Sequence, residues 1–186
     1  MVKLFDKILP RNCNLDMIYD LIANHHWGFA YDNNENEKRL INFVANEGTN
    51  FGFYLKTFLD NKPVFNTSLN IYGKVIVDTV LERLNIQEDL FIRRFFWNMY
   101  FKNSNKMEDH LDSRGPSETD FFSILYPLNT NDGGTIINGK FYPDIMGQAK
   151  VFPSEVLHRG VAPSKDNVRF NLNIILKKPK TVNIWQ

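Results

Sequence analysis

Three features that mark particular protein classes are scarce in this chain of 186 residues. Cys13 is the only cysteine, which excludes an intramolecular disulfide and fits a reducing compartment. The 22 basic and 21 acidic side chains give a net charge of +1, so the overall charge does not favour nucleic acid as a partner. No apolar run is long enough to cross a membrane, and stretch 1–16 lacks the features of a signal peptide. We therefore expect a soluble, cytoplasmic protein, whose compact size would fit a bacterial or phage origin.

The first half of the chain carries helical patterns. Three segments have apolar residues at helical spacing: 13–27, 37–48 and 67–86. Asn14 is a candidate N-cap for the first of them. The third is the longest and most clearly amphipathic, although Gly73 inside it disfavours a helix. These patterns predict that region 1–89 is mainly helical.

From residue 90 onward the pattern is that of strands, rich in aromatic and β-branched residues. The segments concerned are 90–101, 120–129, 133–144, 148–154 and 167–177. Segment 133–144 is typical of a hairpin with Asn138 and Gly139 at its turn. Segment 120–129 is apolar on both faces, and one face would carry Phe122, Ile124, Tyr126 and Leu128. Helices followed by strands predict a single α+β domain over 1–186, in which helical region 1–89 supports a β-sandwich or jelly-roll core over 90–186.

Two of the four histidines stand where they can share a metal ion with a carboxylate. His110 and Asp112 are two residues apart, so in an extended segment both point to the same face. His158 follows the predicted strand 148–154 and completes a set of two histidines and one carboxylate. Such a set occupies one face of a metal ion and leaves three positions open, as in non-haem Fe(II) oxygenases.

The stretch from about residue 91 to 176 resembles the catalytic core of the 2-oxoglutarate- and Fe(II)-dependent dioxygenases, and within them the prolyl-4-hydroxylase-like branch. That family has a His-x-Asp pair, a distal His and a basic residue about ten positions later, which correspond here to His110, Asp112, His158 and Arg169. The resemblance implies a double-stranded β-helix, or jelly-roll, core and an Fe(II) ion held by the first three residues. It covers about half of the chain.

The resemblance also implies a pocket for 2-oxoglutarate. Arg169 would hold its distal carboxylate with Tyr126, and Tyr100 would make a second contact, because a guanidinium fork and a phenol both donate to carboxylates. Arg169 alternates with an apolar row in its strand, so its side chain is expected on the opposite face. The Gly133–Thr135 segment is similar to a turn of the family.

The activity that this resemblance implies is hydroxylation with Fe(II), 2-oxoglutarate and O₂, with ascorbate as an additional candidate cofactor. The expected substrate is a prolyl or other peptidyl residue, and Arg114 and Arg159 beside the ligands are candidate substrate contacts. A free amino acid or another small molecule is an alternative substrate.

Three other functions stay open at this point. Nucleic-acid dealkylation is one, since the Asn98–Tyr100 and Arg169–Leu172 segments are similar to that branch, although Ile175 stands where the branch has a second arginine. A metal-binding, cupin-like protein without turnover is another, and a structural β-sandwich without metal is the third. The sequence does not decide the oligomeric state.

Overall fold

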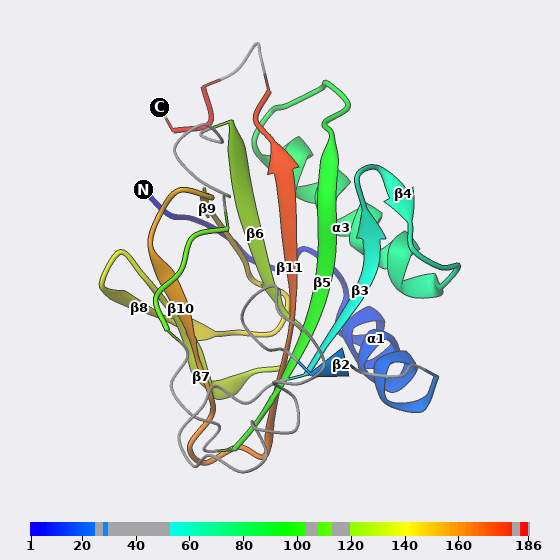
Figure 1. Cartoon of the computed structure of the whole chain (residues 1–186), viewed down its shortest axis with the longest axis vertical. Helices are drawn as coiled ribbons and strands as arrows, with labels where there is room; N and C mark the ends of the chain where they lie inside the picture. The colour runs from blue at the N-terminus through cyan, green and yellow to red at the C-terminus, as the bar shows by residue number, and fades with distance from the viewer. Residues whose placement is uncertain (25–27, 30–52, 103–107, 113–119, 180–182, 186) are drawn as a thin grey trace, which may run out of the picture.

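The computed structural model describes residues 1–24, 28–29, 53–102, 108–112, 120–179 and 183–185. In this part of the chain a large and a small β-sheet pack together, and two helices cover the other face of the large sheet (Figure 1). This arrangement confirms the predicted α+β fold with a jelly-roll core. None of the described helices is long and apolar enough to span a membrane.

Both sheets are antiparallel and join strands that are distant in sequence. The large sheet runs in the order β1 (Lys3–Phe5), β9 (Ala149–Pro153), β6 (Phe121–Pro127), β11 (Val168–Lys177), β5 (Ile92–Phe101), β3 (Phe53–Leu59) and β2 (Gly28–Phe29), and β4 (Lys62–Pro63) pairs with β3. The small sheet runs in the order β10 (His158–Val161), β7 (Asn131–Ile137) and β8 (Lys140–Asp144). Strands β1 to β4 were not predicted, so the N-terminal half contributes to the large sheet as well as supporting it.

The two described helices are α1 (Arg11–Ala23) and α3 (Ser68–Arg83). Thr67 caps α3 by accepting a hydrogen bond from the backbone N–H of Leu69 at 3.3 Å. The prediction of Asn14 as a cap was wrong, because α1 begins after Pro10 and Asn14 lies inside its first turns. The predicted helix over 37–48 lies outside the described residues.

Gly73 has a packing role that explains its place inside α3. A Cβ atom at this position would lie 2.6 Å from Cε2 and 2.7 Å from Cδ2 of Phe95 on β5. Such distances are far inside van der Waals contact, so only glycine lets the helix approach the sheet this closely. The cost of glycine in a helix is therefore offset by close packing.

The two faces of the large sheet differ in chemistry. On β6, Phe122, Ile124 and Tyr126 belong to the main apolar core with the helices. Ser123 and Leu125 point to the opposite side, towards the small sheet. The same alternation on β11 places Arg169 opposite an apolar row, as predicted.

The predicted hairpin over 133–144 is formed by β7 and β8. Asn138 and Gly139 make its turn with positive φ angles of 48° and 75°. This conformation suits asparagine and glycine, and it accounts for the turn signal in the sequence.

Candidate metal centre

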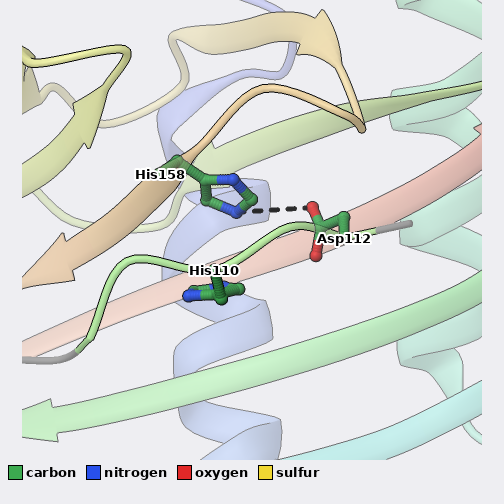
Figure 2. A group of neighbouring side chains, drawn as sticks. All are labelled: His110, Asp112 and His158. Carbon is green, nitrogen blue, oxygen red and sulfur yellow. Dashed lines mark ion pairs between the residues drawn. The ribbon is translucent and has the colours of Figure 1, made fainter. Parts of the chain in front are cut away.

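The structure brings His110, Asp112 and His158 together in space (Figure 2). His110 and His158 form an isolated β-bridge, in which each backbone N–H donates to the other's carbonyl, at 2.9 and 3.0 Å. Asp112 is anchored by its own backbone N–H, which donates to the Ser154 carbonyl at 3.1 Å. One ligand atom from each of the three side chains lies within 4.8 Å of the others. No other group of three such side chains was found among the described residues.

Both imidazole rings are oriented by their Nδ1 atoms. In His158, Nδ1 lies 2.9 Å from the Val156 carbonyl, and in His110, Nδ1 lies 3.1 Å from the Glu108 carbonyl. In the neutral form of each ring, Nδ1 therefore carries the hydrogen and donates, which leaves a lone pair on Nε2. Backbone carbonyls commonly orient metal-binding histidines in this way.

The Nε2 atom of His158 is buried and has no hydrogen-bond partner. It lies 3.5 Å from Oδ2 of Asp112, and the whole residue is only 2% exposed. Burial lowers the pKa of His158, against the opposing effect of Asp112, so the ring stays neutral at physiological pH. A neutral, buried imidazole nitrogen facing a carboxylate is an unsatisfied group that a metal ion would complete.

Asp112 is held by side chains from three adjacent strands. Arg94 on β5 donates to its Oδ1 at 2.7 Å, Ser123 on β6 donates to its Oδ2 at 2.6 Å, and Asn173 on β11 donates at 3.2 and 3.4 Å. Burial alone would raise the pKa of Asp112, but His158, Arg94 and Ser123 outweigh it and lower this pKa to about 2. The carboxylate is therefore ionised and fixed in position.

Arg169 lies in a second polar cluster between the sheets, and it is 2% exposed. Its Nε donates to Asp144 at 2.6 Å and its Nη2 to Thr135 at 3.1 Å, while its guanidinium lies 5.2 Å from the ring centre of Tyr100. Lys150 donates to the other oxygen of Asp144 at 2.8 Å. The structure thus brings the predicted Arg169 and Tyr100 together and adds three residues whose roles were not predicted.

Sequence reasoning missed Asp144 and Lys150 for different reasons. Lys150 stands at an inward position in the otherwise apolar strand β9, and such a lysine is a signal that could have been noticed. Asp144 ends a hairpin, where an acidic residue is common and carries no special signal.

Tyr126 does not join the cluster around Arg169. Its hydroxyl donates to Asn14 of α1 at 2.8 Å, and its ring belongs to the core on the helix-covered face of the sheet. The predicted contact with the 2-oxoglutarate carboxylate does not fit this position, because the sheet itself separates Tyr126 from Arg169. Burial also raises the pKa of Tyr126, so it stays a neutral structural phenol.

The two candidate substrate contacts have different outcomes. Arg159 on β10 forms an ion pair with Asp109 at 2.8 Å, next to His110 in sequence. Arg159 and Asp109 adjoin His158 and His110, so the pair lies beside the candidate metal centre, and the Arg159 side chain, 21% exposed, is in reach of solvent. Arg114 lies outside the described residues.

Comparison with solved structures finds this fold in 2-oxoglutarate-Fe(II) oxygenases. An oxidoreductase of that family from Burkholderia pseudomallei matches with a TM-score of 0.65 and 17% identity, over 95% of this chain and 84% of that chain. The α-ketoglutarate-dependent epimerase SnoN from nogalamycin biosynthesis matches with a TM-score of 0.64 and 8% identity, over 97% and 82%. A prolyl hydroxylase from Trichoplax adhaerens, solved with a peptide fragment of hypoxia inducible factor, matches with a TM-score of 0.63 and 11% identity, over 95% and 83%.

No protein-family model and no curated protein matches the chain. At these low identities the structural likeness establishes the fold alone. The chain has the double-stranded β-helix fold of the 2-oxoglutarate-Fe(II) oxygenases, and prolyl hydroxylases are among the proteins that share it. Within this fold, it carries a His-Asp-His group that can hold a metal ion.

Proposed function

We propose that this chain is an Fe(II)- and 2-oxoglutarate-dependent dioxygenase that hydroxylates its substrate. The observation that carries the proposal is the buried, unpartnered Nε2 of His158, facing Asp112 in a group that His110 completes. Two imidazoles and one carboxylate are the donor set that non-haem Fe(II) oxygenases use. In a structural β-sandwich without metal, this nitrogen would stay unsatisfied.

In this proposal the three ligands hold Fe(II) and the cluster around Arg169 receives 2-oxoglutarate. When bound, Fe(II) with 2-oxoglutarate and O₂ would supply the oxidation, in which the 2-oxo acid becomes succinate and CO₂ and one oxygen atom enters a substrate C–H bond. Arg94 and Ser123 help to keep Asp112 ionised, and together with Asn173 they orient its carboxylate.

The surroundings of Arg169 suit the binding of a carboxylate cosubstrate. Its guanidinium is buried, and Tyr100 lies against it with a phenol that is 7% exposed. Burial raises the pKa of Tyr100, so the hydroxyl keeps its proton and can donate to a carboxylate. Tyr100 therefore takes the second-donor role that Tyr126 cannot fill.

A peptidyl residue, with proline first, is the substrate that we propose. Support comes from the prolyl hydroxylases that share the fold, one of which was solved with a peptide. Arg159, near the ligands and partly exposed, is a candidate contact for such a peptide.

Nucleic-acid dealkylation is the second candidate, and one structural observation favours it. Ile175 occupies the position where that branch has a second arginine, but Arg94 is paired with Ile175 across β5 and β11. Its guanidinium bonds Asp112, so an arginine does occupy this part of the site. The near-neutral net charge argues in the other direction.

Anaerobic titration with Fe(II) and 2-oxoglutarate tests the proposal directly. We expect the weak visible absorption band of a chelated 2-oxo acid in the wild type and its loss in Asp112→Ala. Succinate release would then be compared between proline-containing peptides and N-methylated oligonucleotides. Absence of the band together with absence of bound iron would refute the proposal, while a band without succinate release would indicate a binding protein.

A further inference from the structure

Three charged side chains are buried together between the two sheets. Lys150, Asp144 and Arg169 are 0%, 1% and 2% exposed. Asp144 bridges the two cations, with Oδ1 accepting from Lys150 at 2.8 Å and Oδ2 accepting from Arg169 at 2.6 Å. Each oxygen of this one carboxylate is therefore committed to a different basic residue.

Two basic side chains share a single carboxylate in this cluster. Burial alone would raise the pKa of Asp144, but Arg169 and Lys150 outweigh it and lower this pKa, so the carboxylate is ionised. Burial lowers the pKa of Lys150, and Asp144 opposes this effect. With both basic groups protonated, two cations face one anion, and within the described part of the chain neither has another ion-pair partner. A buried net charge is costly unless a counter-ion joins it, so the cluster is complete only with an added anion.

Lys150 has hydrogen-bond donors that no described residue uses. Its ammonium group carries three hydrogens, and Asp144 is its single hydrogen-bond acceptor among the described residues. Most N–H groups of Arg169 already have acceptors. Asp144 and Thr135 accept two of them, and the side-chain oxygen of Asn171 accepts from Nη1 and Nη2 when its amide group is rotated by 180°. An incoming carboxylate would therefore find free donors chiefly on Lys150.

Strand register places Lys150 on the same side as the metal centre. Lys150 is paired with Leu125 on β6, and Leu125 is paired with Asn173 on β11, which bonds Asp112. Directly paired residues point to the same face of a sheet, and two strand spacings correspond to about 10 Å. Arg169 lies four positions before Asn173 on the same face, or about 13 Å along the strand. These separations join backbone positions, and from them the side chains of both residues extend to Asp144.

We propose that Lys150 is a second cation for the distal carboxylate of the 2-oxo acid, and that Asp144 holds Lys150 and Arg169 in place to receive it. This inference rests on the proposed function, because it assigns a residue to the same cosubstrate. It also predicts selectivity: a 2-oxo diacid completes the charge of the cluster, whereas a 2-oxo acid with a neutral tail leaves it unbalanced.

Lys150→Met tests the assignment, since methionine has a similar length without charge. Binding of 2-oxoglutarate and of 2-oxopentanoate, which has the same carbon chain without the distal carboxylate, would be followed anaerobically in Fe(II)-loaded protein. Loss of one charge-assisted hydrogen bond should weaken 2-oxoglutarate binding by about ten- to a hundredfold. Binding of 2-oxopentanoate should not change. Lys150→Gln, which keeps a donor but no charge, should weaken 2-oxoglutarate binding less.

Thermal unfolding of the ligand-free protein gives a second readout. Lys150→Met removes the uncompensated cation and leaves Asp144 paired with Arg169, so its Tm should equal or exceed that of the wild type. Lys140→Met, on the exposed hairpin strand β8, is the matched control and should bind 2-oxoglutarate as the wild type does.

The outcomes separate this inference from the proposed function. Equal 2-oxoglutarate binding in wild type and Lys150→Met overturns the role of Lys150 while leaving the proposed function intact. The same loss for both 2-oxo acids also overturns it, because it would reveal a general structural defect. Failure of the wild type to bind either acid overturns the proposed function itself.

Discussion

Replacing Asp112 by asparagine removes the single anionic donor of the candidate metal centre while keeping the shape of the side chain. In the metal-free protein the change leaves Arg94 without its carboxylate partner and turns an amide N–H₂ towards other donors. Because the Arg94 side chain is 26% exposed, solvent screens part of this loss, and we expect a destabilisation of about 2 kcal/mol.

The larger effect should appear when metal is added. A ligand at a hundred times its Kd stabilises a folded protein by about 2.7 kcal/mol. For a chain of this length that corresponds to a rise in Tm of roughly 5 to 11 °C. If losing the carboxylate weakens binding about a hundredfold, the same metal concentration equals Kd, and the stabilisation falls to about 0.4 kcal/mol, or roughly 1 °C.

Thermal unfolding with Mn(II), which accepts the same donors as Fe(II) and resists oxidation by air, is a suitable assay. Asp109→Asn is the matched control, since Asp109 adjoins His110 but pairs with Arg159 and stands outside the triad. We expect the control to keep the full rise in Tm. A full rise in Asp112→Asn, or an equal loss in both variants, would show that the assigned triad does not hold the metal.

Three further predictions concern residues around the site. Tyr126→Phe should leave 2-oxoglutarate binding unchanged and lower the unfolding free energy by about 1 kcal/mol in urea titration, because the hydrogen bonds of its hydroxyl, chiefly the one to Asn14, are lost. Gly73→Ala should destabilise by about 1 to 3 kcal/mol in the same assay, because its Cβ would clash with Phe95. Asp144→Asn should cost about 3 to 5 kcal/mol, since two buried cations lose their partner. Folding lowers the pKa of Asp144, so its contribution to the unfolding free energy is fully present above the unfolded-state pKa of about 4. This contribution is lost as the pH falls from that value through the folded-state pKa, and Asp144→Asn should lack this acid-dependent loss of stability.

The candidate metal ligands were predictable because two of them follow local spacing. His110 and Asp112 lie two residues apart, and His158 was the one distant histidine that followed a predicted strand. The orientation of Arg169 was predictable too, since the alternation of its strand separates it from an apolar row. Periodicity therefore identified the elements and the direction of their side chains.

The same periodicity indicates that Tyr126 faces away from the candidate site. Tyr126 shares its face with Phe122 and Ile124, whereas Ser123 and Leu125 face the small sheet. An apolar row of this kind packs against helices. The alternation of side chains along the strand was therefore better evidence for the direction of Tyr126 than the resemblance to the dioxygenase family. The short edge strand β1 and the strand β3 escaped prediction because their pairing depends on β9 and β5, which are distant in sequence.

Local patterns could not predict that these three charged side chains meet in one cluster. Lys150, Asp144 and Arg169 come from three strands in two sheets, and no spacing rule relates them. A buried lysine indicates that a partner exists, but only the tertiary structure shows that this partner is shared.

The way Asp112 is held indicates that the candidate metal centre is preorganised. Asp112 lies outside the regular strands, but Arg94, Ser123 and Asn173 fix its carboxylate from three neighbouring strands of the large sheet. Backbone carbonyls fix both imidazole rings independently of any ion. These side chains therefore lose little further conformational entropy when a metal binds. Their conformational entropy is lost on folding, when the polar face of the large sheet fixes them.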